Sequence, residues 1–154
     1  MKRGLSKMNK AAQTYWDEFW KGAEKPALVS AWMFGVSPDE LAQLVIDEKK
    51  TATCSGHIFY ELDNEPLPEV DEYSIILNGK EEPVAIIKIV DVSIMPMNEV
   101  SEEFAVAEGE GPYEDWKSAH VEFFTSELQE VGLEFSEDML LVCERFKLID
   151  VKEK

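Results

Sequence analysis

The chain has 154 residues, of which 32 are acidic and 15 basic, and its formal net charge at pH 7 is −17. This length suits one domain with its own hydrophobic core, and a hydrophobic fraction of 45% excludes a disordered chain. The negative charge repels polyanions at long range. An extended nucleic acid is therefore an unfavourable partner unless the protein carries a local basic patch.

We expect no targeting segment in this chain and find no metal-binding motif in its sequence. No stretch is long and apolar enough to span a membrane, and no signal-peptide core follows the basic Met1-Lys2-Arg3 start, so we expect a cytoplasmic protein without a membrane partner. Cys54 and Cys143 lie far apart and neither belongs to a Cys-x-x-Cys pair, which predicts reduced thiols. His57 supplies no partner at ligand spacing. We expect neither a metal nor a cofactor.

The N-terminal part predicts one helix between two irregular segments. We expect residues 1–8 to be a flexible extension. Aromatic residues recur at helical spacing from about Asn9 to Trp20 and predict a helix that packs one face on the core. Leu28 to Gly35 is interpreted as a short apolar connection.

A second helix is predicted to begin at Ser37 and to end near Glu48. Ser37 can cap the helix, Pro38 suits its first position, and Glu40 follows the cap by three residues, which is the pattern of a capping box. The segment Thr51 to Ser55 then predicts the start of a strand.

The middle of the chain predicts a β-hairpin. Asn64 to Val70 contains two prolines and is interpreted as a loop. Tyr73 to Leu77 and Val84 to Ile94 are rich in β-branched residues, and the turn signal Asn78-Gly79 lies between them. Pro83 places the start of the return strand a few residues after the turn.

The C-terminal part predicts two helices and a last strand. A short acidic helix is expected over Asn98 to Glu110, and the apolar spacing predicts a second helix from Tyr113 to Leu128, capped by Gly132. Met139 to Ile149 predicts a last strand, and its charge-free run Met139 to Cys143 suggests burial on both faces. Strands and helices that do not alternate regularly favour an α+β fold, in which a small, mostly antiparallel sheet or barrel has helices at one side and the whole chain 1–154 forms one domain.

Lys50 and Thr53 lie at the junction between the second helix and the following strand. A junction of this kind can hold two polar side chains rigidly and still leave them open to a ligand. The alternative is that Lys49 and Lys50 are solvated cations near the negative end of the helix dipole.

The segment Glu108-Gly109-Glu110-Gly111 predicts a tight bend that can bring carboxylates close to another part of the chain. The alternative is an exposed acidic turn. His120 lies on the apolar face of its predicted helix, where a lone histidine is more often a partly buried, hydrogen-bonded group than a metal ligand.

Several segments together resemble the ASCH domain family. The family pattern Gly-x-Lys-x-x-Thr-x-Arg falls on Glu48, Lys50, Thr53 and Ser55, so the lysine and threonine match while glutamate replaces the glycine and serine replaces the arginine. The similar segments cover nearly the whole chain from Trp16 onward. They also include Phe34-Gly35, Pro66-Leu67-Pro68, Phe104-Ala105 with the acidic bend, Trp116 with His120 and Phe123-Phe124, and Cys143-Glu144-Arg145-Phe146.

The resemblance implies a PUA-like fold, which is a small, mostly antiparallel β-barrel with flanking helices. Family members are regarded as RNA-binding, and some resemble amidohydrolases that remove the acyl group from an N-acetylated cytidine. In those members a lysine and a threonine three residues apart work with a glutamate of the later acidic helix. The positions that match are Lys50, Thr53 and Glu108.

We therefore predict a catalytic site at Lys50, Thr53 and Glu108, in a polar cleft for a nucleoside or a similar small amide. A threonine hydroxyl needs a base to become a nucleophile, and a lysine of lowered pKa can supply one. Glu108 can hold the lysine in place or protonate the leaving amine. The residues expected to bind the ligand are Lys49, Ser55, Glu110, Trp116 and His120.

Two other classes of function stay open. In one, the chain is a non-catalytic, PUA-like module that binds a short RNA or a nucleotide through the same cleft, and its affinity falls steeply with added salt. In the other, the site is vestigial and the acidic surface binds a protein partner. The net charge favours a small, neutral ligand, whose binding depends little on long-range repulsion once salt screens the surface.

Overall fold

The structure is a computed structural model that describes residues 4–6, 8–21, 23, 26, 29–109 and 111–152. Its centre is one six-stranded sheet with the strand order β1-β2-β4-β5-β6-β3. The β2–β4 pairing is parallel and the other four pairings are antiparallel. The strands are β1 (Gly4–Ser6), β2 (Val29–Met33), β3 (Ala52–Gly56), β4 (Tyr73–Leu77), β5 (Pro83–Pro96) and β6 (Leu140–Val151).

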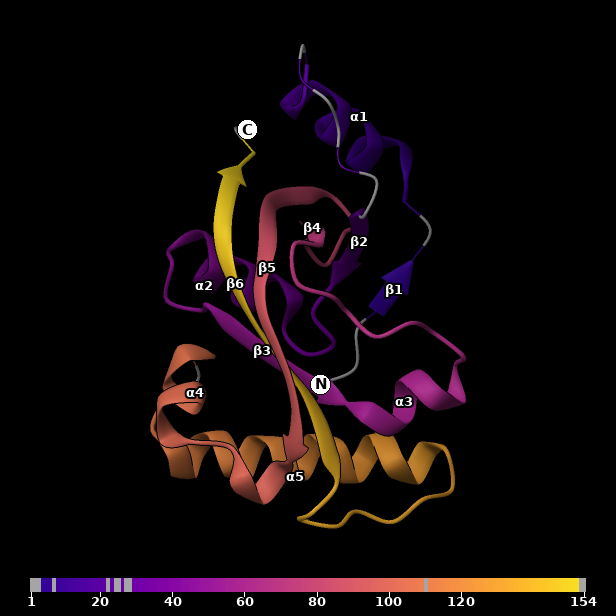
Figure 1. Ribbon diagram of the computed structural model, residues 1–154, viewed down its shortest axis with the longest axis vertical. Coiled ribbons are helices and arrows are strands. Elements are labelled where there is room, and N and C mark those ends of the chain that lie inside the picture. Colours follow the sequence, from indigo (N-terminus) through magenta and orange to yellow (C-terminus); the bar gives the residue numbers. More distant parts are fainter. Residues whose placement is uncertain are drawn as a thin grey trace.

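The fold is α+β, as predicted, but the helices lie around the sheet and not at one side of it (Figure 1). Helix α1 lies at one end of the molecule, and α4 and α5 lie at the opposite end, where α5 passes across the ends of the long strands β5 and β6. The helices are α1 (Lys10–Phe19), α2 (Pro38–Ile46), α3 (His57–Leu62), α4 (Glu102–Ala107) and α5 (Tyr113–Glu130), with the 3₁₀ turn η1 (Met97–Glu99) before α4. No helix in the described ranges is long and apolar enough to cross a lipid bilayer.

The long strands β5 and β6 bend, and the sheet curls with them. Their pairing shifts register between Ile86 and Ile87 and again between Ile89 and Asp91. Each irregularity puts an extra residue on one strand, which bends that strand and increases its twist. The sheet therefore curls toward a half-barrel and has β1 and β3 as its edge strands.

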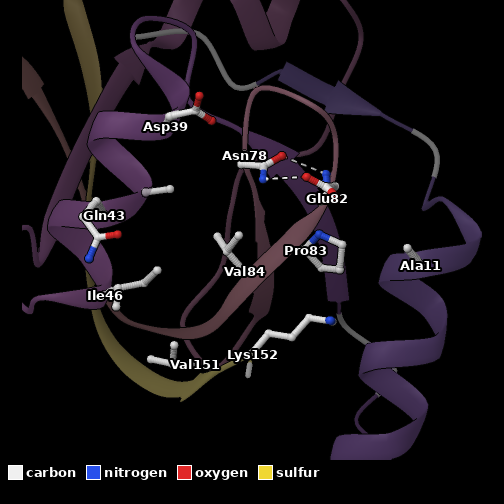
Figure 2. A pocket seen from close by; sticks show the side chains of 11 residues that line it. Ala11, Asp39, Gln43, Ile46, Asn78, Glu82, Pro83, Val84, Val151 and Lys152 are labelled. Carbon is white, nitrogen blue, oxygen red and sulfur yellow. Dashed lines mark hydrogen bonds between the residues drawn. The ribbon is translucent and has the colours of Figure 1, made fainter. Parts of the chain in front are cut away.

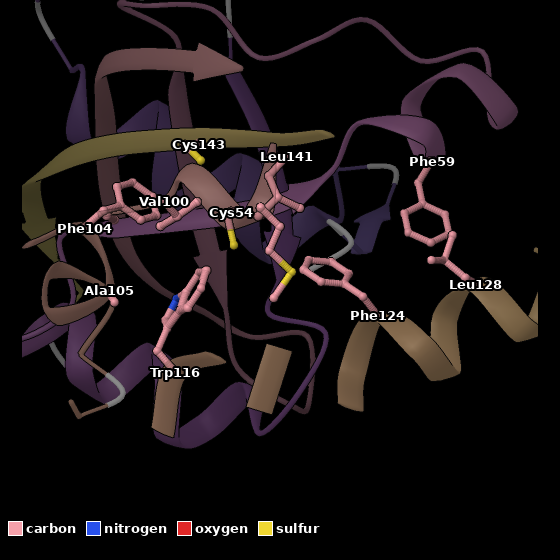
Figure 3. Packing of buried hydrophobic residues seen from close by; sticks show 12 residues of the cluster. Cys54, Phe59, Val100, Phe104, Ala105, Trp116, Phe124, Leu128, Leu141 and Cys143 are labelled. Atoms are coloured by element: carbon pink, nitrogen blue, oxygen red, sulfur yellow. The ribbon is translucent and has the colours of Figure 1, made fainter. Parts of the chain in front are cut away.

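Three clusters of buried side chains form the core. The first packs α4 and α5 against β3 and β6 (Figure 3). The second packs α2 against β2, β4, β5 and β6, and the third packs α1 against β2, β4 and β5. Figure 3 shows Trp116, Phe124 and Leu128 of α5 together with Cys54 of β3 and Leu141 of β6.

Most of the predicted elements are confirmed, but the interpretation of Leu28 to Gly35 as a connection is wrong. Val29–Met33 forms strand β2, with β1 on one side and β4 on the other. Both Ala31 and Trp32 are buried, so this strand lacks the alternation of buried and exposed residues that would have revealed it. Part of the segment expected as a flexible extension, Gly4–Ser6, also forms a strand, whereas residues 1–3 and 7 lie outside the described residues.

Helix α2 begins where it was predicted, but its predicted capping box is wrong. Ser37 has left-handed backbone angles, φ 44° and ψ 57°, and its side chain makes no capping hydrogen bond. Pro38, with its fixed φ, begins the helix. The carboxylate of Asp39 accepts the Gly79 N–H at 2.8 Å and so ties the helix start to the β4–β5 hairpin.

Candidate functional site

A tight turn after α2 directs Lys50 into the protein. Helix α2 ends at Ile46, Glu48 adopts a left-handed φ of 57°, and the N–H groups of Lys49 and Lys50 both donate to the carbonyl of Leu44, at 2.9 and 3.1 Å. The Lys50 side chain is only 1% exposed. The alternative of a solvated cation is therefore wrong for Lys50, whereas Lys49 does point to solvent.

Lys50 contacts Glu108, the residue that ends α4. Its Nζ donates to the Glu108 carbonyl at 3.2 Å and to Oε1 at 3.4 Å. Glu108 is fully buried, so the alternative of an exposed acidic turn is wrong for this residue. Gly109 allows the close approach: it has φ 79°, and a Cβ there would lie 2.9 Å from the Lys49 carbonyl oxygen.

Three further side chains surround the other oxygen of the Glu108 carboxylate. The indole Nε1 of Trp116 donates to Oε2 at 2.5 Å, and the thiol of Cys54 donates to the same atom at 3.3 Å. His120 stacks on Trp116 with ring centroids 4.4 Å apart, and its Nε2 lies 3.6 Å from Oε2. Two expected ligand residues, Trp116 and His120, therefore belong to one buried polar cluster with Lys50 and Glu108.

The ionisable groups of this cluster have shifted pKa values. Burial alone would raise the pKa of Glu108, but Lys50, His120 and the Trp116 hydrogen bond together hold that pKa below its ordinary value. Burial lowers the pKa of His120 to about 4, so the imidazole is neutral at neutral pH. Lys50 is then the cation that compensates an ionised Glu108. Burial and the nearby Glu108 raise the pKa of the Cys54 thiol, which keeps its proton.

Thr53 lies on the other face of β3 from Cys54, because side chains alternate along a strand. Its cross-strand partner is Glu144 of β6, and both residues are buried, with 6% and 1% exposure. Within the described part of the chain, no hydrogen bond joins Thr53 to Lys50 or Glu108. Lys50 lies between the two faces of β3. Its Nζ contacts Glu108 on one side and is also 5.3 Å from the centre of the Phe34 ring, which belongs to the second core cluster.

The other expected ligand residues are placed differently. The Ser55 hydroxyl is buried and lies 2.8 Å from the Tyr60 hydroxyl. Glu110 lies outside the described residues. Three polar side chains near the site were not predicted: Cys54, Tyr60 and Glu144. The resemblance included Glu144 only as part of a motif, and its pairing with Thr53 depends on the β3–β6 register.

Comparison with known proteins identifies the family. A family model described as the ASCH domain matches residues 30–150. The chain belongs to the ASCH domain family. Its curled α+β sheet is the PUA-like fold predicted from the resemblance, a fold of the RNA-binding type. No protein of curated function is similar enough in sequence to match this chain.

Two crystal structures are similar to this ASCH domain. Protein EF3133 from Enterococcus faecalis is 42% identical, with a TM-score of 0.78, and the match covers 90% of this chain and 85% of that one. An ASCH domain from Lactobacillus crispatus is 34% identical, with a TM-score of 0.86, and the match covers 94% of this chain and 98% of that one. The second similarity extends over almost the full length of both chains.

The geometry explains one position of the ASCH pattern. Glu48 stands where the pattern has glycine, and its φ of 57° is a conformation that glycine adopts without strain. A glycine at this position would suit the turn that directs Lys50 inward. Ser55 stands where the pattern has arginine, and this chain replaces a planar, five-donor cation with a hydroxyl that pairs with Tyr60.

A separate hollow of about 790 Å³ lies between α1, α2 and the β4–β5 hairpin (Figure 2). It contains none of the predicted site residues. Several of its polar groups have partners: Asn78 donates to Glu82 at 3.1 Å, Asp39 accepts the Gly79 N–H, and Gln43 donates to Asp47 at 3.0 Å. The lining residues are Ala11, Asp39, Ala42, Gln43, Ile46, Asn78, Glu82, Pro83, Val84, Val151 and Lys152.

Proposed function

We propose that this ASCH domain binds a small nucleoside-like amide beside Lys50 and Thr53 and hydrolyses its amide bond. The observation that carries the proposal is the fully buried ion pair between Lys50 and Glu108, 3.4 Å apart. Neither side chain is exposed to solvent. The pair lies at the turn that begins β3, and Thr53 follows three residues later on the same strand.

A pair of this kind contributes little to stability compared with apolar residues of the same size, because both charges lose their hydration. Perturbed, buried ionisable groups are typical of functional sites. Here the domain buries Lys50, Glu108 and His120 in one cluster, and it buries Glu144 opposite Thr53 on the other face of β3. This concentration of ionisable groups supports a chemical role in preference to a purely structural one.

The net charge of −17 favours a small and uncharged ligand. A long phosphate backbone would be repelled by the acidic surface and would need many basic contacts. A nucleoside carries no phosphate, and its base offers an exocyclic amide when it is acylated. An N-acylated cytidine is therefore the ligand class that we propose.

In the proposed reaction, the Thr53 hydroxyl attacks the amide carbonyl and its proton passes to Glu144, its cross-strand neighbour. Lys50 Nζ donates to the backbone carbonyl and to the side-chain carboxylate of Glu108. We therefore assign Lys50 the role of hydrogen-bond donor to the developing oxyanion and not the role of base. Glu108 holds the Lys50 ammonium in position. The proton on Glu144 then goes to the leaving amine, and water hydrolyses the threonine ester.

The test measures the release of cytidine from N-acetylcytidine by the wild type and by three variants. We expect Thr53→Ala and Glu144→Gln to lose at least about 100-fold in kcat/KM, because each removes a group that acts in the transition state. Thr125→Ala is the matched control. Thr125 lies on α5, and its hydroxyl bonds only to the Val121 carbonyl among the described residues. Equal rates in the wild type and Thr53→Ala, or no turnover by the wild type, would remove the enzymatic proposal.

A second candidate is a non-catalytic module that binds RNA, which the PUA-like fold favours. The exposed Lys49 and the partly exposed Lys117, which pairs with Glu137 at 3.7 Å, are the cations next to Lys50 and Trp116 in sequence that could contact phosphates. Under this candidate, a short single-stranded RNA binds with an affinity that falls steeply as salt increases, and Lys49→Ala reduces the salt slope by about 0.7, the value for one phosphate contact of a single strand. Binding of free N-acetylcytidine without any affinity for RNA would favour the first candidate.

A further inference from the structure

We propose that Cys54, Glu108 and His120 form a site for a transition-metal ion of the zinc type. One ligand atom from each residue, the thiol sulfur, a carboxylate oxygen and an imidazole nitrogen, lies within 4.8 Å of the other two. The residues come from β3, the end of α4 and α5, so only the folded chain assembles them. The site shares Glu108 with the proposed amide hydrolysis, but no step of that reaction uses the ion.

The distances fit tetrahedral coordination. Zinc lies about 2.3 Å from sulfur and about 2.0 Å from oxygen or nitrogen, which places sulfur and oxygen ligands of one ion about 3.5 Å apart and nitrogen and oxygen ligands about 3.3 Å apart. In the structure, Cys54 Sγ lies 3.3 Å from Glu108 Oε2, and His120 Nε2 lies 3.6 Å from the same oxygen. The third pair, Cys54 Sγ and His120 Nε2, lies within 4.8 Å, so an ion among the three atoms would require these two side chains to approach each other by at most about 1.3 Å.

The imidazole of His120 is oriented as a metal ligand. Its Nδ1 lies 2.8 Å from the backbone carbonyl of Trp116, which can only accept, so the proton of the neutral ring lies on Nδ1. The lone pair of Nε2 then faces Glu108. Histidines that bind metals commonly donate their other ring N–H to a backbone carbonyl in this way, which fixes both the tautomer and the ring orientation.

The two oxygens of the Glu108 carboxylate have separate partners. Lys50 contacts Oε1, while Cys54, Trp116 and His120 approach Oε2. The ion would replace the thiol proton that now lies between Cys54 and Oε2, and Lys50 would remain as a neighbour that orients the carboxylate. Sulfur and imidazole ligands favour zinc, cobalt, nickel or copper over magnesium and calcium, which prefer oxygen.

All three ligand residues are 0 to 2% exposed, so an ion would enter while the chain folds or during a local opening. The experiment therefore uses the full chain expressed in minimal medium with Co²⁺, and the same chain unfolded and refolded with one equivalent of Co²⁺. Cobalt bound by a thiolate gives a charge-transfer absorption in the near ultraviolet, which reports sulfur coordination directly. Elemental analysis of the purified protein gives the stoichiometry, and competition with Zn²⁺ should abolish the cobalt absorption.

Two pairs of variants assign the ligands. We expect Cys54→Ser to lose the charge-transfer band, and Cys143→Ser, which removes the equally buried thiol on the facing strand, to keep it. His120→Gln should lower the Co²⁺ affinity at least tenfold, while His57→Gln, at the partly exposed His57–Glu61 pair, should leave it unchanged. Circular dichroism of each variant shows whether it is folded.

The absence of stoichiometric cobalt in both preparations of the wild type would overturn the proposal. So would a band that survives Cys54→Ser in a folded protein or that disappears with Cys143→Ser alone. Because the readouts are metal content and absorption, they are distinct from the turnover assay, and either proposal can fail without the other.

Discussion

The buried cluster around Glu108 and the open hollow beside α2 use polar residues in opposite ways. In the hollow, the polar groups lie at the surface and pair with near neighbours, as Asn78 does with Glu82. In the cluster, the carboxylate of Glu108 is sealed and receives donors from the turn before β3, from β3 and from α5. The hollow offers volume, about 790 Å³, whereas the cluster offers perturbed ionisable groups.

The buried ionisable groups and the open hollow therefore lie in different parts of this ASCH domain. A large hollow whose polar side chains lie near water or have partners of their own needs no ligand to explain its composition. A sealed cluster of ionisable groups requires an explanation, because isolated buried charges are costly. The two regions should therefore respond very differently when a charged side chain is removed.

Lys50→Met should destabilise the protein by about 3 to 5 kcal/mol, because it leaves the Glu108 carboxylate buried without its cation. Urea unfolding at pH 7 measures the loss. Lys152→Met removes a lysine that lines the hollow and is exposed, and its effect should stay within about 0.5 kcal/mol.

The double variant Lys50→Met/Glu108→Gln sharpens the test. It removes both charges and should recover part of the loss, since the remaining amide can still accept the Trp116 N–H. If Lys50→Met lowered the free energy of unfolding no more than Lys152→Met, the Lys50–Glu108 pair would not be sealed from water. The contrast between the two regions would then be wrong.

The sequence predicted the local elements well because their signals are local. Helix α5 and the hairpin strands β4 and β5 follow from spacing and turn residues within each segment. Strand β2 and helix α3 were missed for physical reasons. The centre of β2 is buried on both faces, and α3 has only six residues, too few for a periodic pattern.

The candidate site was predictable only in part. The contact between Lys50 and Glu108 was expected from the family resemblance, although spacing alone favoured two solvated charges. The position of Cys54 beside Glu108 depends on which face of β3 turns toward α4 and α5. The pairing of Thr53 with Glu144 depends on the register of two strands about 90 residues apart, which no local pattern specifies.

Tyr15→Phe tests the end of the molecule opposite the Glu108 cluster. The Tyr15 hydroxyl donates to the Asp150 carboxylate at 2.7 Å, and its loss should cost about 2 kcal/mol at pH 7. Burial, followed by the hydrogen bond and the charge of Asp150, raises the pKa of Tyr15 well above its usual value. The unfolded chain ionises this tyrosine near pH 10, so its contribution is complete below that pH and is lost as the pH rises further, by about 1.4 kcal/mol per unit.

Urea unfolding between pH 7 and pH 11 measures this effect as the difference between the wild type and Tyr15→Phe. The difference should be constant to about pH 10 and then shrink. Tyr113→Phe is the control at the other end of the molecule, where no described residue hydrogen-bonds to the hydroxyl. A difference that grew with pH would mean that Tyr15 is ionised more easily in the folded protein.

The smallest expected effect concerns the turn that directs Lys50 inward. Glu48→Gly should stabilise the protein by about 0.5 to 1 kcal/mol, because Glu48 has a left-handed φ of 57° that glycine adopts without strain. The neighbouring Asp47→Gly, at an ordinary φ of −79°, should instead lose a similar amount. Thermal unfolding of both variants measures the contrast. If Glu48→Gly gained stability and kept the turnover of N-acetylcytidine, a glycine at this position would serve the backbone conformation alone. A loss of stability would mean that the Glu48 side chain itself supports the turn.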